Sequence, residues 1–176
     1  ISFAGICQVS GQTQPAKAIA HPSWSAQSNI YEVNLRQYST SGSFAEFSKH
    51  MPRLRKMGVD ILWFMPITPI GIEGRKMTAA DLGSYYAVRN YTAVNEEHGT
   101  LADFKKLVKK AHQLGFKVIT DWVANHSAPD NHWVKAHPDF YTKDSTGKFV
   151  SPFDWTDVYK LNYKSNELHD RNLSPD

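Results

Sequence analysis

A short polar segment carries three side chains whose types and spacing could do chemistry. Asp121, Asn125 and His126 place a carboxylate, an amide and an imidazole within six residues. They follow 116–120, a run of aromatic and β-branched residues that is typical of a strand. Such groups can hydrogen-bond sugar hydroxyls, hold a hard cation through oxygen, or tie loops together. The spacing alone leaves a binding site and a satisfied structural cluster equally open.

Alternating strands and helices are expected to position this segment. We predict strands at 30–34, 61–65 and 116–120 from alternating or continuous apolar runs, and helices at 44–57 and 101–114 from apolar residues three and four apart. Ser43 and Glu46 form a capping-box pattern before the first helix, and Thr100 and Asp103 form a weaker one before the second. This order predicts right-handed βαβ units in a parallel sheet, with chemistry at the carboxyl ends of the strands.

Two long segments without periodicity leave the predicted sheet at those ends. The loop over 67–99 is interrupted by Gly and Pro, and the segment from 126 to about 163 is rich in Asp, Asn, Pro, Lys and aromatic residues. Loops of this length in a compact domain are usually functional. Both segments are therefore candidates to build a site.

The composition is that of a globular protein and excludes some classes of function. The 176 residues are 41% hydrophobic and 21% charged, with a net charge of +3. No run approaches the roughly 18 apolar residues of a membrane-spanning helix, so no span is predicted. Lys105, Lys106, Lys109 and Lys110 have helical spacing, which indicates a solvated helix face rather than a nucleic-acid-binding patch. The single cysteine, Cys7, leaves the redox compartment open.

The first residues resemble the end of a secretory signal peptide. Residues 1–7 are apolar, and small and polar residues follow up to Ala18. We interpret residues 1–25 as a signal-peptide remnant and linker, and we expect the protein to be exported. A buried first strand is the alternative.

An ordered set of motifs resembles the α-amylase family of glycoside hydrolases. The pattern Asp121-x-Val123-x-Asn125-His126 resembles the first conserved region of that family, at the end of its third barrel strand. The other features in the family's order and spacing are the strands at 30–34 and 61–65, the segment 86–91, and the pair Gly99-Thr100. The resemblance extends over about residues 29–168.

This resemblance implies an α/β fold: a partial (β/α)8 TIM barrel with the first three strands. The barrel part would occupy 26–125, an irregular inserted region 126–168, and an atypical tail 169–176. The family acts on α-linked glucans such as starch or maltodextrin, usually with retention of anomeric configuration. An α-glucan oligo- or polysaccharide is therefore the expected partner, and carbohydrate metabolism the expected role.

The resemblance also implies roles for individual residues. Tyr86 would stack on the sugar ring next to the cut bond, and His126 would hydrogen-bond a hydroxyl of that sugar. Asp121 would brace the site, and Asn125 would face the calcium site of many members. Lys160 stands where many relatives carry an Asp that helps to bind this ion, so no calcium and no other cofactor is expected.

No catalytic residue is assigned to this sequence. Retaining glycoside hydrolysis needs two carboxyl groups about 5 Å apart, and the family places them after the fourth and fifth strands. Only Asp121 is a carboxylate at a predicted strand end, so an inactive fragment of an α-glucan hydrolase is expected. One alternative is a non-catalytic α-glucan-binding protein that uses Tyr86, Trp122 and His126. Another is a truncation product without function, whose unpaired strand edge favours aggregation.

Overall fold

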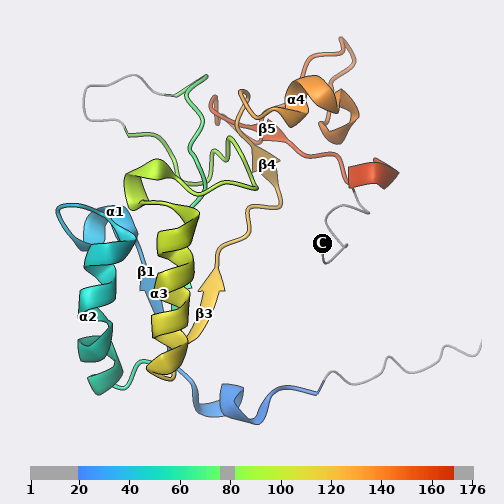
Figure 1. The fold of residues 1–176 in the computed structure, drawn as a ribbon. Helices are drawn as coiled ribbons and strands as arrows, with labels where there is room; N and C mark the ends of the chain where they lie inside the picture. Colours follow the sequence, from blue (N-terminus) through green and yellow to red (C-terminus); the bar gives the residue numbers. More distant parts are fainter. Residues whose placement is uncertain (1–19, 76–81, 169–176) are drawn as a thin grey trace, which may run out of the picture.

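The structure, a computed structural model, describes residues 20–75 and 82–168. Its centre is a parallel sheet with the strand order β1 (Ile30–Val33), β2 (Ile61–Phe64) and β3 (Lys117–Thr120). The register aligns the last residues of the three strands, so their carboxyl ends share one edge of the sheet (Figure 1). The predicted α/β class and parallel strands are confirmed, and each strand is one residue shorter than predicted.

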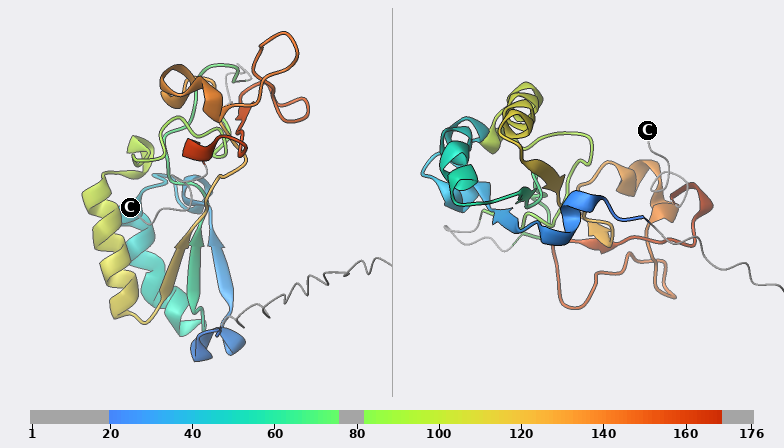
Figure 2. Two further views of the ribbon diagram at one scale, coloured as in Figure 1. Left: turned by 90° about the vertical axis from the view of Figure 1, so that its right-hand side faces the viewer. Right: turned by 90° about the horizontal axis from the view of Figure 1, so that it is seen from below.

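Helices α2 (Phe44–Lys56) and α3 (Leu101–Gln113) cover one face of this sheet, as Figure 2 shows. Phe64 of β2 is fully buried beneath them, with its ring centroid 5.3 Å from that of Phe47 and 6.2 Å from that of Phe104. The other buried members of this core include Val33, Phe44, Met51, Leu54, Leu62, Leu107 and Ala111. The period of apolar residues in both helices therefore produces the packing that it predicts.

Of the two helix caps, the one before α3 is the more complete, although its sequence pattern is the weaker one. Before α3, Thr100 and Asp103 form the full reciprocal capping box, and the hydrogen bonds from Thr100 lower the pKa of Asp103 to about 2. Before α2, the Ser43 hydroxyl accepts from the backbone N–H of Glu46, whose carboxylate pairs with Lys49 at 2.6 Å. The longer side chain of Glu46 reaches the next turn, so the pattern predicted to be weaker is the complete one.

The opposite face of the sheet carries no element of the described part of the chain (Figure 2). Ile30 and Ile119 on this face are 58% and 44% exposed. The register places Glu32, Trp63 and Ile119 in one row across it. The face thus mixes apolar and charged side chains.

The segment after β3 has more order than its sequence predicted. Strands β4 (His126–Ser127) and β5 (Tyr159–Lys160) pair in antiparallel fashion, and His126 lies opposite Lys160. Strands of two residues show no period, which is why the sequence predicted an irregular region. The short helices of the described chain are η1 (Ser23–Gln27), α1 (Leu35–Tyr38), η2 (Glu96–His98), α4 (Trp133–Ala136) and η3 (Pro138–Phe140). A separate small core contains Phe140, Tyr141, Leu161 and Leu168.

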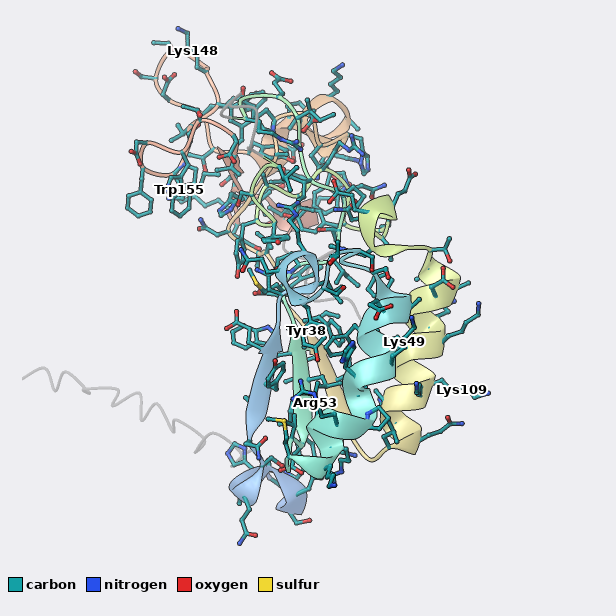
Figure 3. All side chains as sticks on the ribbon, turned by 90° about the vertical axis from the view of Figure 1, so that its left-hand side faces the viewer. Tyr38, Lys49, Arg53, Lys109, Lys148 and Trp155 are labelled. Atoms are coloured by element: carbon teal, nitrogen blue, oxygen red, sulfur yellow. The ribbon has the colours of Figure 1, made fainter. Side chains whose placement is uncertain are left out.

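Several predictions concern the surface and the ends of the chain. Lys109 points away from the sheet in Figure 3, and Lys105 and Lys106 are also exposed, which confirms a solvated face for these three. Lys110 is half-buried and donates to the Ser48 carbonyl at 2.7 Å. Most of the leader-like segment (1–19) and the tail (169–176) lie outside the described residues, so export stays a prediction. Within the described ranges, no helix has the length and apolar character to cross a membrane.

Buried His98 is expected to make the stability of the fold depend on pH. Its side chain is 2% exposed, Nδ1 lies 2.8 Å from the Gly42 carbonyl oxygen, and burial lowers its pKa below the ordinary 6.5. The unfolded chain then takes up a proton at a higher pH than the folded chain. The stability that comes from burying the neutral His98 imidazole is fully present above pH 6.5. It is lost as the pH falls from 6.5 toward the lowered pKa of His98 in the folded chain. Urea unfolding between about pH 7.5 and 5.5 should show this slope, and it should be smaller in His98→Gln. Equal slopes would contradict the assignment.

Candidate functional site

A pocket of about 540 Å³ lies where the loop after β2 meets the segment after β3. Its volume is in the range of small-molecule sites. The side chains that matter for its chemistry are Arg75, Tyr86, His126, Asp154, Trp155 and Asp157. The structure thus brings Tyr86 and His126, which the family resemblance proposed as sugar-binding residues, into one pocket.

Tyr86 is oriented by the first residue after β3. Its hydroxyl donates to Asp121 Oδ2 at 3.1 Å, and the Asp121 backbone N–H donates to the Phe64 carbonyl at 2.8 Å. The backbone hydrogen bond to β2 therefore holds Asp121 in place, and the Asp121 carboxylate in turn orients the Tyr86 ring. Burial and the negative charge of Asp121 raise the pKa of Tyr86 above 10.0, so the hydroxyl remains a donor at neutral pH. The side chain keeps 36% exposure, which leaves part of the ring open to a ligand.

His126 is a nearly buried, neutral imidazole. It is 7% exposed, and burial lowers its pKa, although the Asp157 carboxylate and the Tyr86 backbone carbonyl oppose this effect. The Asn125 amide nitrogen lies 3.0 Å from Nδ1 and can donate to it, which leaves the proton on Nε2. The ring also meets the edge of Trp155, with centroids 5.4 Å apart. A neutral imidazole has one N–H, which here can donate either to the Tyr86 backbone carbonyl or to a hydroxyl group of a ligand.

Tyr91 holds the backbone of the polar segment in place. Its hydroxyl lies 2.9 Å from the Val123 carbonyl oxygen and 2.8 Å from that of His126, so it bridges both ends of the turn. Its ring stacks on Trp133 with centroids 4.9 Å apart. Burial raises the pKa of Tyr91 far above its ordinary value, which keeps the hydroxyl protonated. The sequence placed Tyr91 in a matching segment but gave no signal for this bridging contact.

Other proposed residues lie beside the pocket rather than in its lining. The Asn125 side chain contacts the His126 ring, as described above. Asp121 lines a smaller hollow of about 240 Å³. Trp122 lines that second hollow too, and its ring lies 5.4 Å from Tyr91. Trp122 thus lies in this second hollow and not among the residues that line the pocket of Tyr86 and His126.

The residues around Asn125 do not fit a calcium site. Among residues 20–75 and 82–168, no group of three His, Cys, Asp or Glu side chains is placed to hold a metal ion. The Asn125 side chain contacts the His126 ring, and Lys160 lies opposite His126 in the strand pair. A lysine at that place disfavours a divalent cation. The absence of calcium stays a prediction, and no chemistry is assigned to a metal.

The far wall of the pocket comes from residues 154–158, directly after Phe153, and the sequence assigned no binding role to them. Phe153 is 86% exposed and has a φ of 53°, a left-handed conformation that disfavours a bulky side chain by about 1–2 kcal/mol. Thr156 Oγ1 donates to the Gly74 carbonyl at 3.0 Å. A Cβ at Gly74 would collide with the Thr156 carbonyl oxygen, so only glycine permits this approach.

Parallel strands with two helices on one face and a polar and aromatic pocket at their carboxyl ends are the arrangement of one part of a β/α-barrel protein, whose site lies at the same strand ends. The family model described as the catalytic domain of alpha amylase matches residues 23–170. The chain therefore belongs to the α-amylase family, and the resemblance seen in its motifs is confirmed.

Solved structures support the same assignment. An alpha-amylase from Lactobacillus plantarum is 44% identical, with a TM-score of 0.76 over 81% of this chain and 33% of that chain. A maltogenic alpha-amylase from Thermotoga neapolitana is 40% identical, with a TM-score of 0.73 and the same coverage. This chain thus matches about a third of each of these two structures.

Curated relatives include enzymes that transfer sugars. The alpha-1,4-glucan:maltose-1-phosphate maltosyltransferase of Corynebacterium pseudotuberculosis is 36% identical over 141 residues, which are 72% of this chain and 21% of that protein. The chain spans about a fifth to a quarter of the curated relatives that it matches. Family membership therefore does not decide between hydrolysis and transfer.

Proposed function

We propose that this chain forms one wall of the substrate cleft in an α-amylase family enzyme acting on α-linked glucans. The observation that carries the proposal is the pocket in which Tyr86 and His126 face a common space, with the Tyr86 hydroxyl fixed by Asp121. An aromatic face packs against the C–H face of a pyranose, while a neutral imidazole donates to a hydroxyl. The names of the relatives, two amylases and a glucan maltosyltransferase, agree with an α-glucan as the ligand.

The proposed reaction is hydrolysis of the α-glucosidic bond with retention of configuration. In that mechanism a carboxylate attacks the anomeric carbon while a carboxylic acid protonates the oxygen of the leaving sugar, and water, deprotonated by that second group, then releases the glycosyl group. Transfer of the same glycosyl group to another acceptor is the second candidate, which the 36% identity to a maltosyltransferase favours. Both reactions need the same recognition of the sugar beside the cut bond.

Asp121 is proposed to position Tyr86 rather than to attack the sugar. In the described ranges it is the one carboxylate directly after a strand of the parallel sheet, and its Oδ2 is engaged by Tyr86. A retaining mechanism needs two carboxyl groups about 5 Å apart. We therefore expect this 176-residue chain to bind α-glucans without cleaving them.

Titration calorimetry with maltoheptaose tests this proposal, with cellohexaose as a β-linked control of similar chemistry. The chain should bind maltoheptaose saturably and cellohexaose at least about tenfold more weakly, a difference of roughly 1.4 kcal/mol. If a fusion partner is used, it must not bind maltodextrins itself.

Two outcomes would contradict different parts of the proposal. Equal or absent binding of both sugars would reject the α-glucan cleft. Release of reducing ends by the purified chain, measured over the same period, would reject the statement that it binds without cleaving.

A further inference from the structure

We propose that Phe153 and Trp155 form a second sugar-binding surface at the rim of the pocket, which takes a further glucosyl unit of the same α-glucan. This inference rests on the proposed function, because it extends the site of Tyr86 and His126. No family motif identified in the sequence includes these two residues.

Three rings run in a row from solvent to the pocket. The Phe153 and Trp155 centroids are 5.2 Å apart with an interplanar angle of 55°, and the Trp155 and His126 centroids are 5.4 Å apart at 70°. The rings are tilted, so they do not cover each other's faces. Trp155 is 43% exposed and Phe153 86% exposed, which leaves aromatic surface available for a ligand. Figure 3 shows Trp155 on the segment beyond the strand ends, away from α2 and α3.

Two hydrogen bonds hold the segment that carries these rings in place. The Thr156 hydroxyl donates to the Gly74 carbonyl at 3.0 Å, which links it to the loop after β2. The Lys160 N–H donates to the Val150 carbonyl at 2.8 Å, which closes its base. An exposed ring on a tied segment loses little conformational freedom when it binds, and this favours affinity.

The left-handed conformation of Phe153 supports a binding role. It is the one non-glycine residue with positive φ in the described part of the chain, and its ring is almost fully solvated. Folding gains little from an exposed ring in a disfavoured backbone conformation. Such conformations gather at sites that bind ligands.

The chemistry of the surrounding groups favours a sugar over a purely apolar ligand. Asp154 lies between the two aromatic residues in sequence, Asp157 follows two residues after Trp155, and Arg75 lines the same pocket. Carboxylates and a guanidinium next to flat rings match a pyranose, which presents hydroxyls at its rim and C–H groups on its faces.

The test compares Phe153→Ala and Trp155→Ala with the unchanged chain across maltose, maltotriose and maltoheptaose by titration calorimetry. Each substitution should weaken maltoheptaose binding about tenfold, which is the loss of one ring contact. Phe153→Ala should leave maltose binding within about twofold, because the outer ring is reached only by longer chains. Phe153→Tyr and Trp155→Phe, which keep an aromatic face, should restore most of the affinity.

The outcomes separate this inference from the proposed function. If the unchanged chain binds no maltooligosaccharide, the proposed function fails and this inference fails with it. If the unchanged chain binds maltoheptaose and both alanine variants bind it equally well, only the second surface is rejected. Circular dichroism of each variant shows whether it is folded. Phe153 does not line the inner pocket, so equal losses of affinity for all three lengths in Phe153→Ala would also reject a distinct outer surface.

Discussion

Replacing Tyr86 with alanine is expected to weaken maltoheptaose binding by about 30-fold. The change removes a ring that lines the pocket and keeps 36% exposure. Loss of its stacking and of the apolar area that it covers corresponds to about 2 kcal/mol. Because the inner part of the pocket is affected, maltose and maltoheptaose should both bind more weakly. Titration calorimetry measures this directly.

Tyr86→Phe is the matched control for this change. It keeps the ring but removes the hydroxyl that donates to Asp121 at 3.1 Å. That hydrogen bond is already present in the free chain and orients the ring, so its loss is expected to weaken binding by no more than about fivefold, well below the effect of removing the ring. Wild-type affinity in Tyr86→Ala would show that the ring does not contact the sugar.

Replacing Phe64 with alanine is expected to lower the free energy of unfolding by about 3–5 kcal/mol. Phe64 is 0% exposed and contacts Phe47 on α2 and Phe104 on α3. The substitution would leave a cavity between the sheet and both helices. Neither helix can shift to fill this cavity without losing its packing against the other helix. Since stabilities of 5–15 kcal/mol are usual, this loss would leave the chain largely unfolded at moderate urea concentrations.

The same substitution at an exposed position provides the control. Phe153→Ala removes the same atoms from a side chain that is 86% exposed and in a left-handed conformation. It should change the unfolding free energy by less than about 0.5 kcal/mol. Urea unfolding followed by circular dichroism compares the two variants. A loss of similar size in both would contradict the assignment of the core.

The strands and helices of the sheet layer were predictable because each is long enough to show its pattern of apolar residues in the sequence. Thirteen-residue helices and strands of apolar and β-branched residues leave clear patterns, and the capping residues mark where α2 and α3 begin. Helix α1 has four residues and is started by the Asn34 side chain, which accepts from the Gln37 N–H. A single turn of helix carries no apolar period, so the sequence could not show it.

The inner half of the candidate site was predictable from motifs, but its outer half was not. Tyr86, Asp121 and His126 stand next to recognisable segments, and the structure brings them together. Trp155 reaches the pocket only because the Thr156 segment packs against Gly74, 82 residues away in sequence. A contact of that kind depends on tertiary packing, so no local sequence pattern predicts it.

The order of pairing in the sheet has a consequence for how the chain acquires its structure during synthesis. β1 pairs with β2 and β2 with β3, so every pairing joins strands that are neighbours along the chain. The first pairs of the register, Ile30 with Ile61 and Ile61 with Lys117, need only the part of the chain up to the end of β3. The ribosome releases the chain from its amino end, so the layer of α2, α3 and three strands can form before the segment that carries Trp155 emerges. The sheet would then serve as the template on which the pocket of Tyr86 and His126 is completed.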